Sequence, residues 1–187
     1  MEQDHGTMRP ADARHRKIGD PSPWIVRHAD QIPPSGTVLD LAAGGGRHAR
    51  YLRDRGHPVV AVDRSLDGLC DFADMPDVEL IEADLEDGSP WPLAGRGFDA
   101  VVVANYLHRP LLPAIVSAVA PGGLLLYETF ALGNERFGKP SNPDYLLKPE
   151  ELLAAVAGTL RVLAYEDIVV EQPKPAAIQH ICARRDA

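Results

Sequence analysis

The residue types that suggest chemistry gather in one short stretch, residues 38–48, with the sequence VLDLAAGGGRH. The apolar run at 37–41 favours a buried parallel strand, and three glycines follow it at once. The next residues, 47–55, predict a helix that ends near Gly56. Glycine lets a backbone approach a ligand closely, and the start of a helix offers free N–H groups to it. A strand that turns on glycines into a helix therefore indicates a nucleotide-binding site.

Two kinds of cofactor use such a turn, and the residues around the glycines help to separate them. A dinucleotide fold has the pattern G-x-G-x-x-G/A and an acid about twenty residues further on. Gly44, Gly46 and Ala49 satisfy this pattern, and Asp63 stands in the place of the acid. In a dinucleotide fold, however, the strand runs straight into the first glycine. Here Asp40 lies within the strand end and a loop of small residues follows. An NAD-binding protein remains the alternative that this stretch alone leaves open.

The spacing Asp40-x-Ala42-x-Gly44-x-Gly46 resembles the first motif of the class I S-adenosylmethionine-dependent methyltransferases, D/E-x-G-x-G-x-G, with Ala42 in place of the first glycine. The resemblance implies that S-adenosylmethionine is the cofactor and that Gly44 and Gly46 lie against it. It also implies that Asp40 either positions the loop or meets the amino group of the methionine part.

Acidic residues follow the next two apolar runs, at the positions where strands are expected to end. Asp63 closes the run 58–62, and an acid there can accept hydrogen bonds from both ribose hydroxyls. Asp84 and Leu85 follow the run 78–82. The resemblance implies that Asp84 binds the adenine amino group and that the backbone N–H of Leu85 binds a ring nitrogen. The neighbouring acids also suit a merely solvated loop.

The run 98–104 predicts a fourth strand and resembles the family's strand that begins with Phe-Asp. It places Asn105, Tyr106 and His108 at its carboxyl end, the edge at which open α/β sheets bind ligands. We expect Asn105 to contact the cofactor, and Tyr106 and His108 to face the methyl acceptor. His108 is the candidate general base, because histidine exchanges protons near neutral pH. Its alternative role is that of a capping or packing residue before Pro110.

Further candidates for contact with the acceptor lie in and beside a long loop, residues 130–147. Such a loop next to an active edge is usually a lid or a binding loop. Asn134 is one candidate. Arg136 together with Arg109 would suit an anionic acceptor, unless both are solvated surface charges. Trp24 is either a wall or lid of the pocket or the hydrophobic anchor of the short helix that it begins.

The order of the predicted elements decides the fold class. Strands and helices alternate up to residue 157, and two strand-like runs, 160–171 and 176–184, then follow with a short link between them. A short link between long strands predicts an antiparallel hairpin. The expected fold is therefore α/β: a Rossmann-like, mostly parallel sheet that ends in an antiparallel C-terminal hairpin, as in the class I methyltransferases. Residues 23–187 suffice for this single domain, and the polar, proline-punctuated residues 1–22 are expected to form a flexible tail.

Several other stretches strengthen the resemblance and narrow it. The Pro-Gly-Gly turn at 121–123, before a predicted strand at 124–128, is a further feature of class I methyltransferases. A bacterial group related to the tellurite-resistance methyltransferases is similar in several segments, namely residues 22–24, 105–110, 128–138, 142–147 and 150–152. The link at 172–175 has no His-Arg pair of the kind associated with the tellurite-active members. This difference from the tellurite-active members weighs against a tellurite or selenite substrate.

Composition bounds the remaining function classes. A formal charge of −8 disfavours nucleic acid as the main partner, because phosphate binding requires clustered Lys and Arg. No apolar run approaches the length of a membrane span, and no signal peptide begins the chain. The two cysteines form neither a disulfide framework nor a metal-binding pair. We expect a cytoplasmic protein with a small-molecule substrate and without a metal, a nucleic acid or a membrane partner.

The sequence thus predicts methyl transfer from S-adenosylmethionine to a small cytoplasmic acceptor by in-line displacement. Ala42 and the lack of an obvious paired catalytic constellation keep a second class open, a non-catalytic S-adenosylmethionine-binding sensor or partner subunit. An NAD-binding oxidoreductase is the third candidate. Binding of S-adenosylmethionine and its turnover separate the three.

Overall fold

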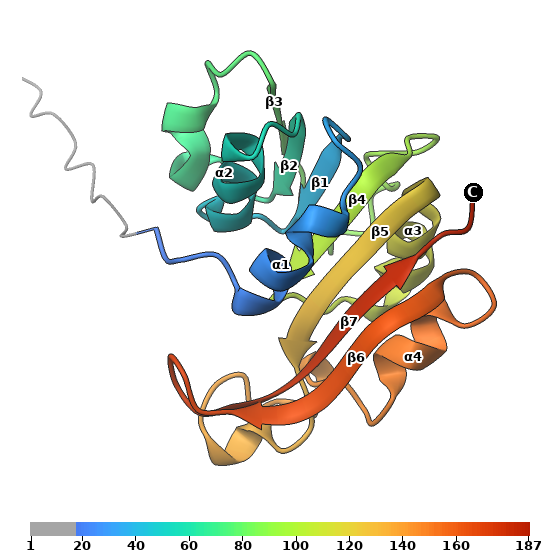
Figure 1. The fold of residues 1–187 in the computed structure, drawn as a ribbon. Coiled ribbons are helices and arrows are strands. Elements are labelled where there is room, and N and C mark those ends of the chain that lie inside the picture. Colours follow the sequence, from blue (N-terminus) through green and yellow to red (C-terminus); the bar gives the residue numbers. More distant parts are fainter. Residues whose placement is uncertain (1–17) are drawn as a thin grey trace, which may run out of the picture.

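Seven strands form one sheet in the computed structural model, which describes residues 18–187 (Figure 1). In chain order they are β1 (Val38–Leu41), β2 (Val59–Asp63), β3 (Val78–Glu82), β4 (Phe98–Ala104), β5 (Val119–Phe130), β6 (Arg161–Val170) and β7 (Ala176–Arg184). Their order across the sheet is β3-β2-β1-β4-β5-β7-β6. The strands from β1 to β5 pair in parallel, whereas β7 runs antiparallel to both β5 and β6. This confirms the predicted fold, a mostly parallel sheet closed by an antiparallel C-terminal hairpin.

Helices cover both faces of the sheet. The α-helices between residues 18 and 187 are α1 (Pro23–His28), α2 (Arg47–Asp54), α3 (Leu112–Ser117) and α4 (Glu151–Val156). Short 3-10 helices accompany them: η1 (Ala29–Gln31), η2 (Asp67–Phe72), η3 (Arg109–Leu111), η4 (Asn134–Arg136) and η5 (Pro143–Tyr145). In Figure 1, α1 and α2 lie in front of the sheet, and α3 and α4 lie behind it.

Alternating side chains along the strands divide the core between the two faces. The face behind packs against α3 and α4 through buried apolar residues of three central strands: Leu39, Leu41, Val101, Val103, Leu125 and Tyr127. The face in front packs against α1 and α2 through the residues between them: Val38, Ala100, Val102, Leu124 and Leu126. Asp40 follows this second alternation in β1 and Glu128 follows it in β5. Both carboxylates therefore belong to the face that α1 and α2 cover.

Strand β5 is longer than the sequence predicts. It begins at Val119 and includes the Pro-Gly-Gly segment that was expected to form a turn before it. The register between β4 and β5 shifts near Phe98, and Gly122 has a φ angle of +76°. A Cβ added to Gly123 would lie 2.8 Å from the carbonyl oxygen of Phe98. The glycines thus allow a kink inside the strand, where neighbouring backbones approach too closely for a side chain.

The predicted polar tail falls mainly outside the described residues. Its last residue, Ser22, is 4% exposed, and its Oγ accepts a hydrogen bond from the backbone N–H of Trp24 at 3.1 Å, which caps α1. No helix between residues 18 and 187 is long and apolar enough to cross a membrane. Over the same range, no group of three or more His, Cys, Asp or Glu side chains is arranged to hold a metal ion.

Candidate functional site

The glycine loop links the carboxyl end of β1 to the start of α2. Ala42, Gly44 and Gly46 all have positive φ angles, of +55°, +57° and +73°. A Cβ added to Gly46 would lie 2.3 Å from Cδ2 of Leu69, so packing as well as conformation favours glycine there. Nothing lies within 4 Å of a Cβ added to Gly44. The loop therefore presents bare backbone to an open space at the carboxyl edge of the sheet, which suits a ligand that approaches the main chain.

The positive φ of Ala42 leads to a stability prediction. A left-handed conformation costs an alanine about 1–2 kcal/mol, and replacement by glycine adds about 0.4–1 kcal/mol of freedom to the unfolded chain. We expect Ala42→Gly to raise the free energy of unfolding by a net amount of about 0.5–1 kcal/mol in urea denaturation. Ala73→Gly is the control, because exposed Ala73 has an ordinary φ of −65° and should lose stability. A loss in both variants would refute the strain.

Asp40 ties the glycine loop to α2. The residue is 1% exposed, and its Oδ2 accepts a hydrogen bond from the backbone N–H of Ala49 at 2.9 Å. Burial raises the pKa of Asp40 to about 7, whereas that hydrogen bond and the positive charge of Arg47 act in the opposite direction. Of the two roles predicted for Asp40, the geometry supports the positioning of the loop.

Asp63, the last residue of β2, lies beside the glycine loop. Its Oδ2 accepts a hydrogen bond from the backbone N–H of Gly44 at 2.7 Å, and its Oδ1 accepts one from Ser65 at 3.2 Å. Each carboxylate oxygen has a further lone pair, and the side chain is only partly buried. The structure thus brings Gly44 and Asp63, both predicted from the sequence, together at the carboxyl edge of the sheet. Two acceptor oxygens next to an open glycine backbone fit the hydroxyls of an adenosine ribose.

Asp84 and Leu85 follow β3 and line a cavity of about 330 Å³. Trp91 and Leu111 contribute apolar surface to the same cavity. Asp84 is exposed, and its Oδ1 accepts a hydrogen bond from the backbone N–H of Glu86 at 2.9 Å. A cavity with both apolar and carboxylate surface suits a flat, amino-bearing ring, so the arrangement is compatible with the adenine contacts that the sequence predicts.

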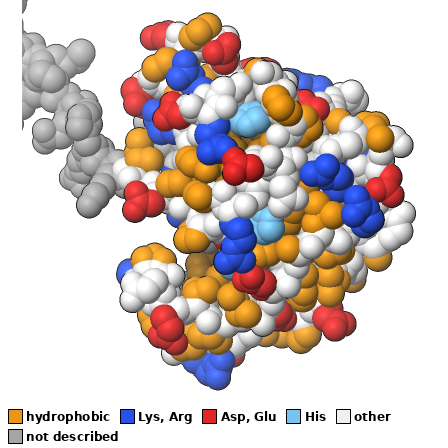
Figure 2. All heavy atoms as spheres, in the orientation of Figure 1, with side chains coloured by type: hydrophobic (Ala, Val, Ile, Leu, Met, Phe, Trp, Pro, Cys, Tyr) orange, Lys and Arg blue, Asp and Glu red, His pale blue; other side chains and the backbone are white. Residues whose placement is uncertain are grey.

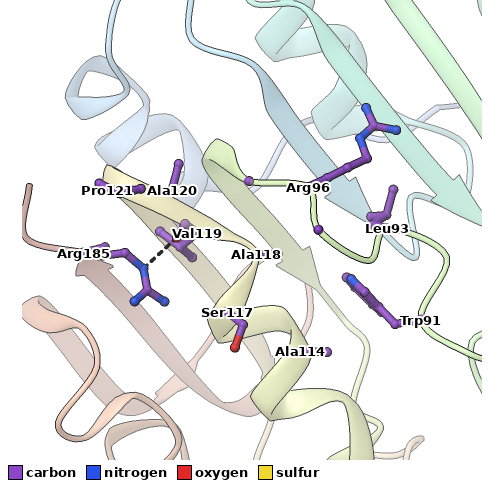
Figure 3. Close-up of a pocket in the computed structure, with 12 residues that line it drawn as sticks. Trp91, Leu93, Arg96, Ala114, Ser117, Ala118, Val119, Ala120, Pro121 and Arg185 are labelled. Carbon is purple, nitrogen blue, oxygen red and sulfur yellow. Dashed lines mark hydrogen bonds between the residues drawn. The ribbon is translucent and has the colours of Figure 1, made fainter.

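A second cavity, of about 650 Å³, lies at the opposite edge of the sheet, where β4 and β5 begin (Figure 3). Trp91 and Arg96 line one side of it and Ser117 lines the other. Arg185 also borders it, but its Nε donates to the carbonyl oxygen of Val119 at 2.7 Å. No residue predicted to bind cofactor or acceptor lines this cavity, so it is not part of the candidate site.

Asn105 and Tyr106 leave β4 at the same edge as the glycine loop. Asn105 is exposed, has a φ angle of +56°, and donates its backbone N–H to the carbonyl oxygen of Glu128 at 3.0 Å. Burial, and then the carboxylates of Glu86 and Asp84, raise the pKa of Tyr106 well above its usual range. Tyr106 therefore keeps its proton near neutral pH and is suited to donate a hydrogen bond, not to act as a base.

His108 is half-buried at the start of η3. Its carbonyl oxygen accepts the backbone N–H of Leu111 at 3.0 Å. Neither ring nitrogen makes a hydrogen bond with any other residue of the described chain. A general base is usually oriented by a third group. The structure gives His108 a position at the carboxyl edge but no such orienting partner.

Arg109 does not point toward an acceptor. Its Nε and Nη2 contact the carboxylate of Glu151 at 2.6 and 3.0 Å. Its Nη1 donates to the carbonyl oxygen of Asp144 at 2.5 Å, and Nη2 also donates to that of Leu146 at 2.8 Å. The guanidinium thus holds the loop before α4, and the predicted contact of Arg109 with an anionic acceptor stays a prediction.

Asn134 and Trp24 are likewise used by the fold. Asn134 is 2% exposed; its Nδ2 donates to the carbonyl oxygen of Pro140 at 2.9 Å, and its Oδ1 accepts the backbone N–H of Ala177 at 3.2 Å. Trp24 is also 2% exposed and donates from Nε1 to the carbonyl oxygen of Ile181 at 3.3 Å. The polar atoms of both side chains are therefore used by the fold, and their predicted contacts with an acceptor stay predictions. Asn134 fastens the loop to β7, and Trp24 is the hydrophobic anchor of α1.

The segment between β5 and α4, residues 131–150, forms a lobe beyond the carboxyl end of β5 (Figure 1), and the surface is recessed beside it (Figure 2). A bridge between Ala131 and Leu147 closes its base. Arg136 is exposed there, and its Nε donates to the carbonyl oxygen of Gly133 at 3.1 Å. The lobe also exposes large apolar side chains, Leu132, Phe137 and Tyr145. Arg136 is thus the one predicted acceptor contact in this lobe that the fold leaves exposed.

Sequence reasoning missed Glu128, near the end of β5. The residue is 8% exposed, Ser22 Oγ donates to its Oε2 at 2.6 Å, and Nε2 of His180 lies 3.4 Å from the same oxygen. A signal was present, because Glu128 alternates with Leu124 and Leu126 and must share their inward face. A carboxylate at an inward position of a buried strand is unusual enough to mark a candidate site.

Comparison with known proteins links residues 38–123 to a family model described as a methyltransferase domain. A demethylmenaquinone methyltransferase from Renibacterium salmoninarum is 31% identical over 123 residues, which are 61% of this chain and 50% of that protein. Its counterpart from Corynebacterium urealyticum is 34% identical over 111 residues, 57% of this chain and 46% of the relative. The chain spans about half the length of the curated relatives it matches.

Solved structures resemble the fold over more of the chain. TehB from Haemophilus influenzae has a TM-score of 0.68 at 19% identity, and the match covers 87% of this chain and 61% of that one. The 1,6-didemethyltoxoflavin-N1-methyltransferase from Burkholderia thailandensis, solved with 1,6-didemethyltoxoflavin and S-adenosylhomocysteine bound, has a TM-score of 0.60 at 18% identity. That match covers 88% of this chain and 76% of the other. At such identities the likeness concerns the fold.

Proposed function

Because the chain belongs to the class I S-adenosylmethionine-dependent methyltransferases, we propose that it transfers the methyl group of this cofactor to a small cytoplasmic molecule. One observation carries the proposal. The backbone N–H of Gly44 donates a hydrogen bond to Oδ2 of Asp63 at 2.7 Å, next to an open space at the carboxyl edge of the sheet. The named substrates of two similar proteins, demethylmenaquinone and 1,6-didemethyltoxoflavin, are small molecules and support the acceptor class.

The residues present fit the cofactor at that edge. We assign its contacts to Asp40, Ala42, Gly44, Gly46, Asp63, Asp84, Leu85 and Asn105. In this assignment Asp63 accepts hydrogen bonds from the ribose, and Asp84 with the N–H of Leu85 binds adenine. The bare backbone at Gly44 leaves room for the methionine part. Asp40 acts through the loop that it fixes to α2, as its hydrogen bond to Ala49 indicates.

Replacing Asp63 by Ala should weaken the binding of S-adenosylhomocysteine by about 1–3 kcal/mol, or about 5- to 150-fold, through lost charge-assisted hydrogen bonds. Isothermal titration calorimetry measures the change. Asp74→Ala is the matched control, because Asp74 is exposed between η2 and β3 and should leave the affinity unchanged. Equal affinities for wild type and Asp63→Ala would remove Asp63 from the cofactor site.

The chemistry is an in-line displacement, for which bound S-adenosylmethionine supplies a methyl group activated by the sulfonium charge. The chain's contribution is to hold the acceptor in line with that methyl group and to exclude water. We place His108, Tyr106 and Arg136 on the acceptor side. Tyr106 would donate a hydrogen bond, and Nε2 or Nδ1 of His108 would take the proton that an O–H or N–H acceptor must lose.

Turnover tests the methyl transfer itself. Purified protein, S-adenosylmethionine and a panel of thiols, metalloid oxyanions, amines and phenols should yield S-adenosylhomocysteine and one methylated product in equal amounts. A non-catalytic sensor is the second candidate, favoured by the unpartnered ring of His108 and by Ala42 in the glycine loop. Tight cofactor binding without turnover of any acceptor would support the sensor against the enzyme.

A further inference from the structure

Three ionisable side chains form a row across neighbouring strands. Glu128 of β5 lies opposite His180 of β7, and His180 lies opposite Glu166 of β6, so all three project from the same face of the sheet. His180 Nε2 is 3.4 Å from Oε2 of Glu128, and its Nδ1 is 3.4 Å from Oε2 of Glu166. These strands stand side by side (Figure 1), and α1 contacts two of them, β7 through Trp24 and β6 through Arg27.

The row begins at the edge where the glycine loop lies. Glu128 is the pairing partner of Ala104, the last residue of β4, and its carbonyl oxygen accepts the backbone N–H of Asn105. Its carboxylate is on the same face as Asp40, and Nη2 of Arg47, the first residue of α2, is 3.9 Å from Oε1. Glu128 is therefore a neighbour of the cofactor edge on the side toward β7.

One buried polar atom in this row, Nε2 of His180, lacks a hydrogen-bond partner in the described chain. Glu128 is 8% exposed; Ser22 holds its Oε2 at 2.6 Å, but Oε1 accepts no hydrogen bond. His180 is 6% exposed, and its Nε2 makes no hydrogen bond despite its distance of 3.4 Å from Glu128. Unsatisfied buried polar groups are costly in a protein interior. A ligand group that met the His180 nitrogen would recover that cost, and Oε1 of Glu128 has lone pairs with which to accept a hydrogen bond from the same ligand.

The charges around the row select the kind of partner. Nη1 of Arg27 pairs with the carboxylate of Glu166 at 2.7 Å. Nη1 of Arg47 donates a hydrogen bond to the carbonyl oxygen of Asp20 at 3.3 Å. Arg109 is committed to the loop before α4. Among the described residues, the two arginines beside this row, Arg27 and Arg47, are thus already paired with its carboxylates. An oxyanion would meet like charge there, whereas an ammonium, hydroxyl or N–H donor would meet an acceptor oxygen.

We propose that Glu128, oriented by Ser22 and His180, binds a cationic or hydrogen-bond-donating group of the methyl acceptor, so that a neutral or cationic N–H or O–H compound is preferred to a metalloid oxyanion. The inference rests on the proposed function and narrows it. It assigns recognition to Glu128 and leaves proton removal with His108. Trp24 lies against this site, since its ring centroid is 4.8 Å from that of His180.

Binding to the S-adenosylhomocysteine complex tests the proposal. The probes are phenethylamine, phenol, hydroquinone and sodium selenite, and the readout is the indole N–H signal of Trp24 in ¹⁵N spectra. That signal is assigned from the spectrum of Trp91→Phe, since the chain has two tryptophans. We expect at least one amine or phenol to shift the signal, and selenite to leave it in place. Selenite binding, or silence with every amine and phenol, overturns the proposal.

Variants assign the effect to the carboxylate. Glu128→Gln should weaken the binding of the amine or phenol at least tenfold, and Glu128→Asp should keep the preference over selenite. Glu171→Gln, the same change at an exposed residue of the β6–β7 link, should have no effect. Circular dichroism verifies that each variant is folded. If Glu128→Gln does not fold, Ser22→Ala removes the orienting hydrogen bond instead and should also weaken the probe.

The affinity for the cofactor product distinguishes a failure of the acceptor site at Glu128 from a failure of the proposed methyl transfer. Glu128→Gln should bind S-adenosylhomocysteine as the wild type does. A loss of tenfold or more would place Glu128 in the cofactor site and overturn the acceptor assignment while the methyltransferase proposal stands. A wild-type protein that does not bind S-adenosylhomocysteine would instead contradict the proposed function and the acceptor site with it.

Discussion

Replacing Asp40 by Asn is expected to raise the free energy of unfolding at pH 8, and the gain should vanish as the pH falls toward 4. Burial raises the pKa of Asp40 from 3.8 to about 7. Between these values the folded protein holds a proton that the unfolded chain has released, so the wild type loses stability as the pH rises through this window. The loss is on the order of 4 kcal/mol at most. Asparagine stays neutral and can still accept the hydrogen bond of Ala49.

The neighbouring His48 gives the unfolding free energy the opposite dependence on pH. The wild type alone therefore does not separate the two residues, and a variant is needed. Burial, and then Arg47, lower the pKa of His48 to about 3, and its Nε2 accepts the backbone N–H of Ser22 at 3.2 Å. As the pH falls below 6.5 the unfolded chain gains a proton on this ring and the folded protein does not, so stability decreases toward acid. The two dependences offset each other in the wild type. Asp40→Asn should expose the dependence of His48, with stability rising from pH 4 to pH 6.5.

Urea denaturation at several pH values between 4 and 8, followed by circular dichroism, measures both effects. The quantity compared is the difference in unfolding free energy between variant and wild type. Asp74→Asn serves as the control, because the exposed Asp74 should give a small difference that does not vary with pH. A difference between Asp40→Asn and wild type that stays constant across the range would show that Asp40 is ionised in the folded protein.

Replacing His108 by Gln should lower turnover of a protic acceptor about a hundredfold or more, because general base catalysis contributes about 10²–10⁴ to rate. The affinity for S-adenosylhomocysteine should remain nearly unchanged, since His108 is assigned to the acceptor side. Steady-state kinetics with the acceptor found in the turnover panel gives the rate, and calorimetry gives the affinity.

An acceptor that is already ionised provides the control within the same variant. A thiolate has no proton to lose, so His108→Gln should change its methylation only slightly. Equal losses for protic and ionised acceptors would mean that His108 positions the acceptor and is not the base. Because no residue of the described chain orients the ring of His108, comparing protic with ionised acceptors tests its role as a base more directly than comparing the variant with wild type.

Much of the fold follows from the sequence because apolar runs and their breakers are local signals. The strands at 59–63, 78–82 and 98–104 lie within a residue or so of their predicted bounds. The long β5 was not predictable in this way. Its Pro-Gly-Gly segment has the local chemistry of a turn, and only the close backbone of Phe98 explains why the strand continues through it.

The site shows the same division between local and tertiary information. The glycine loop and Asp63 were predictable, because each closes a buried strand and parallel strands end at one edge. Arg109 and Asn134 were not, since residue type does not reveal whether a side chain's hydrogen bonds are consumed by the fold. The alternation along β5 indicates that Glu128 faces inward, but its contacts with Ser22 and His180 were not predictable, because both residues are far away in sequence.

Calorimetric titration of the wild-type protein with S-adenosylhomocysteine, S-adenosylmethionine and NAD tests the central claim most directly. We predict saturable binding of both S-adenosyl compounds, with a stoichiometry of one and a Kd on the order of micromolar. NAD should not compete with either. Failure of both S-adenosyl compounds to bind at millimolar concentration, or tight binding of NAD in their place, would contradict the account.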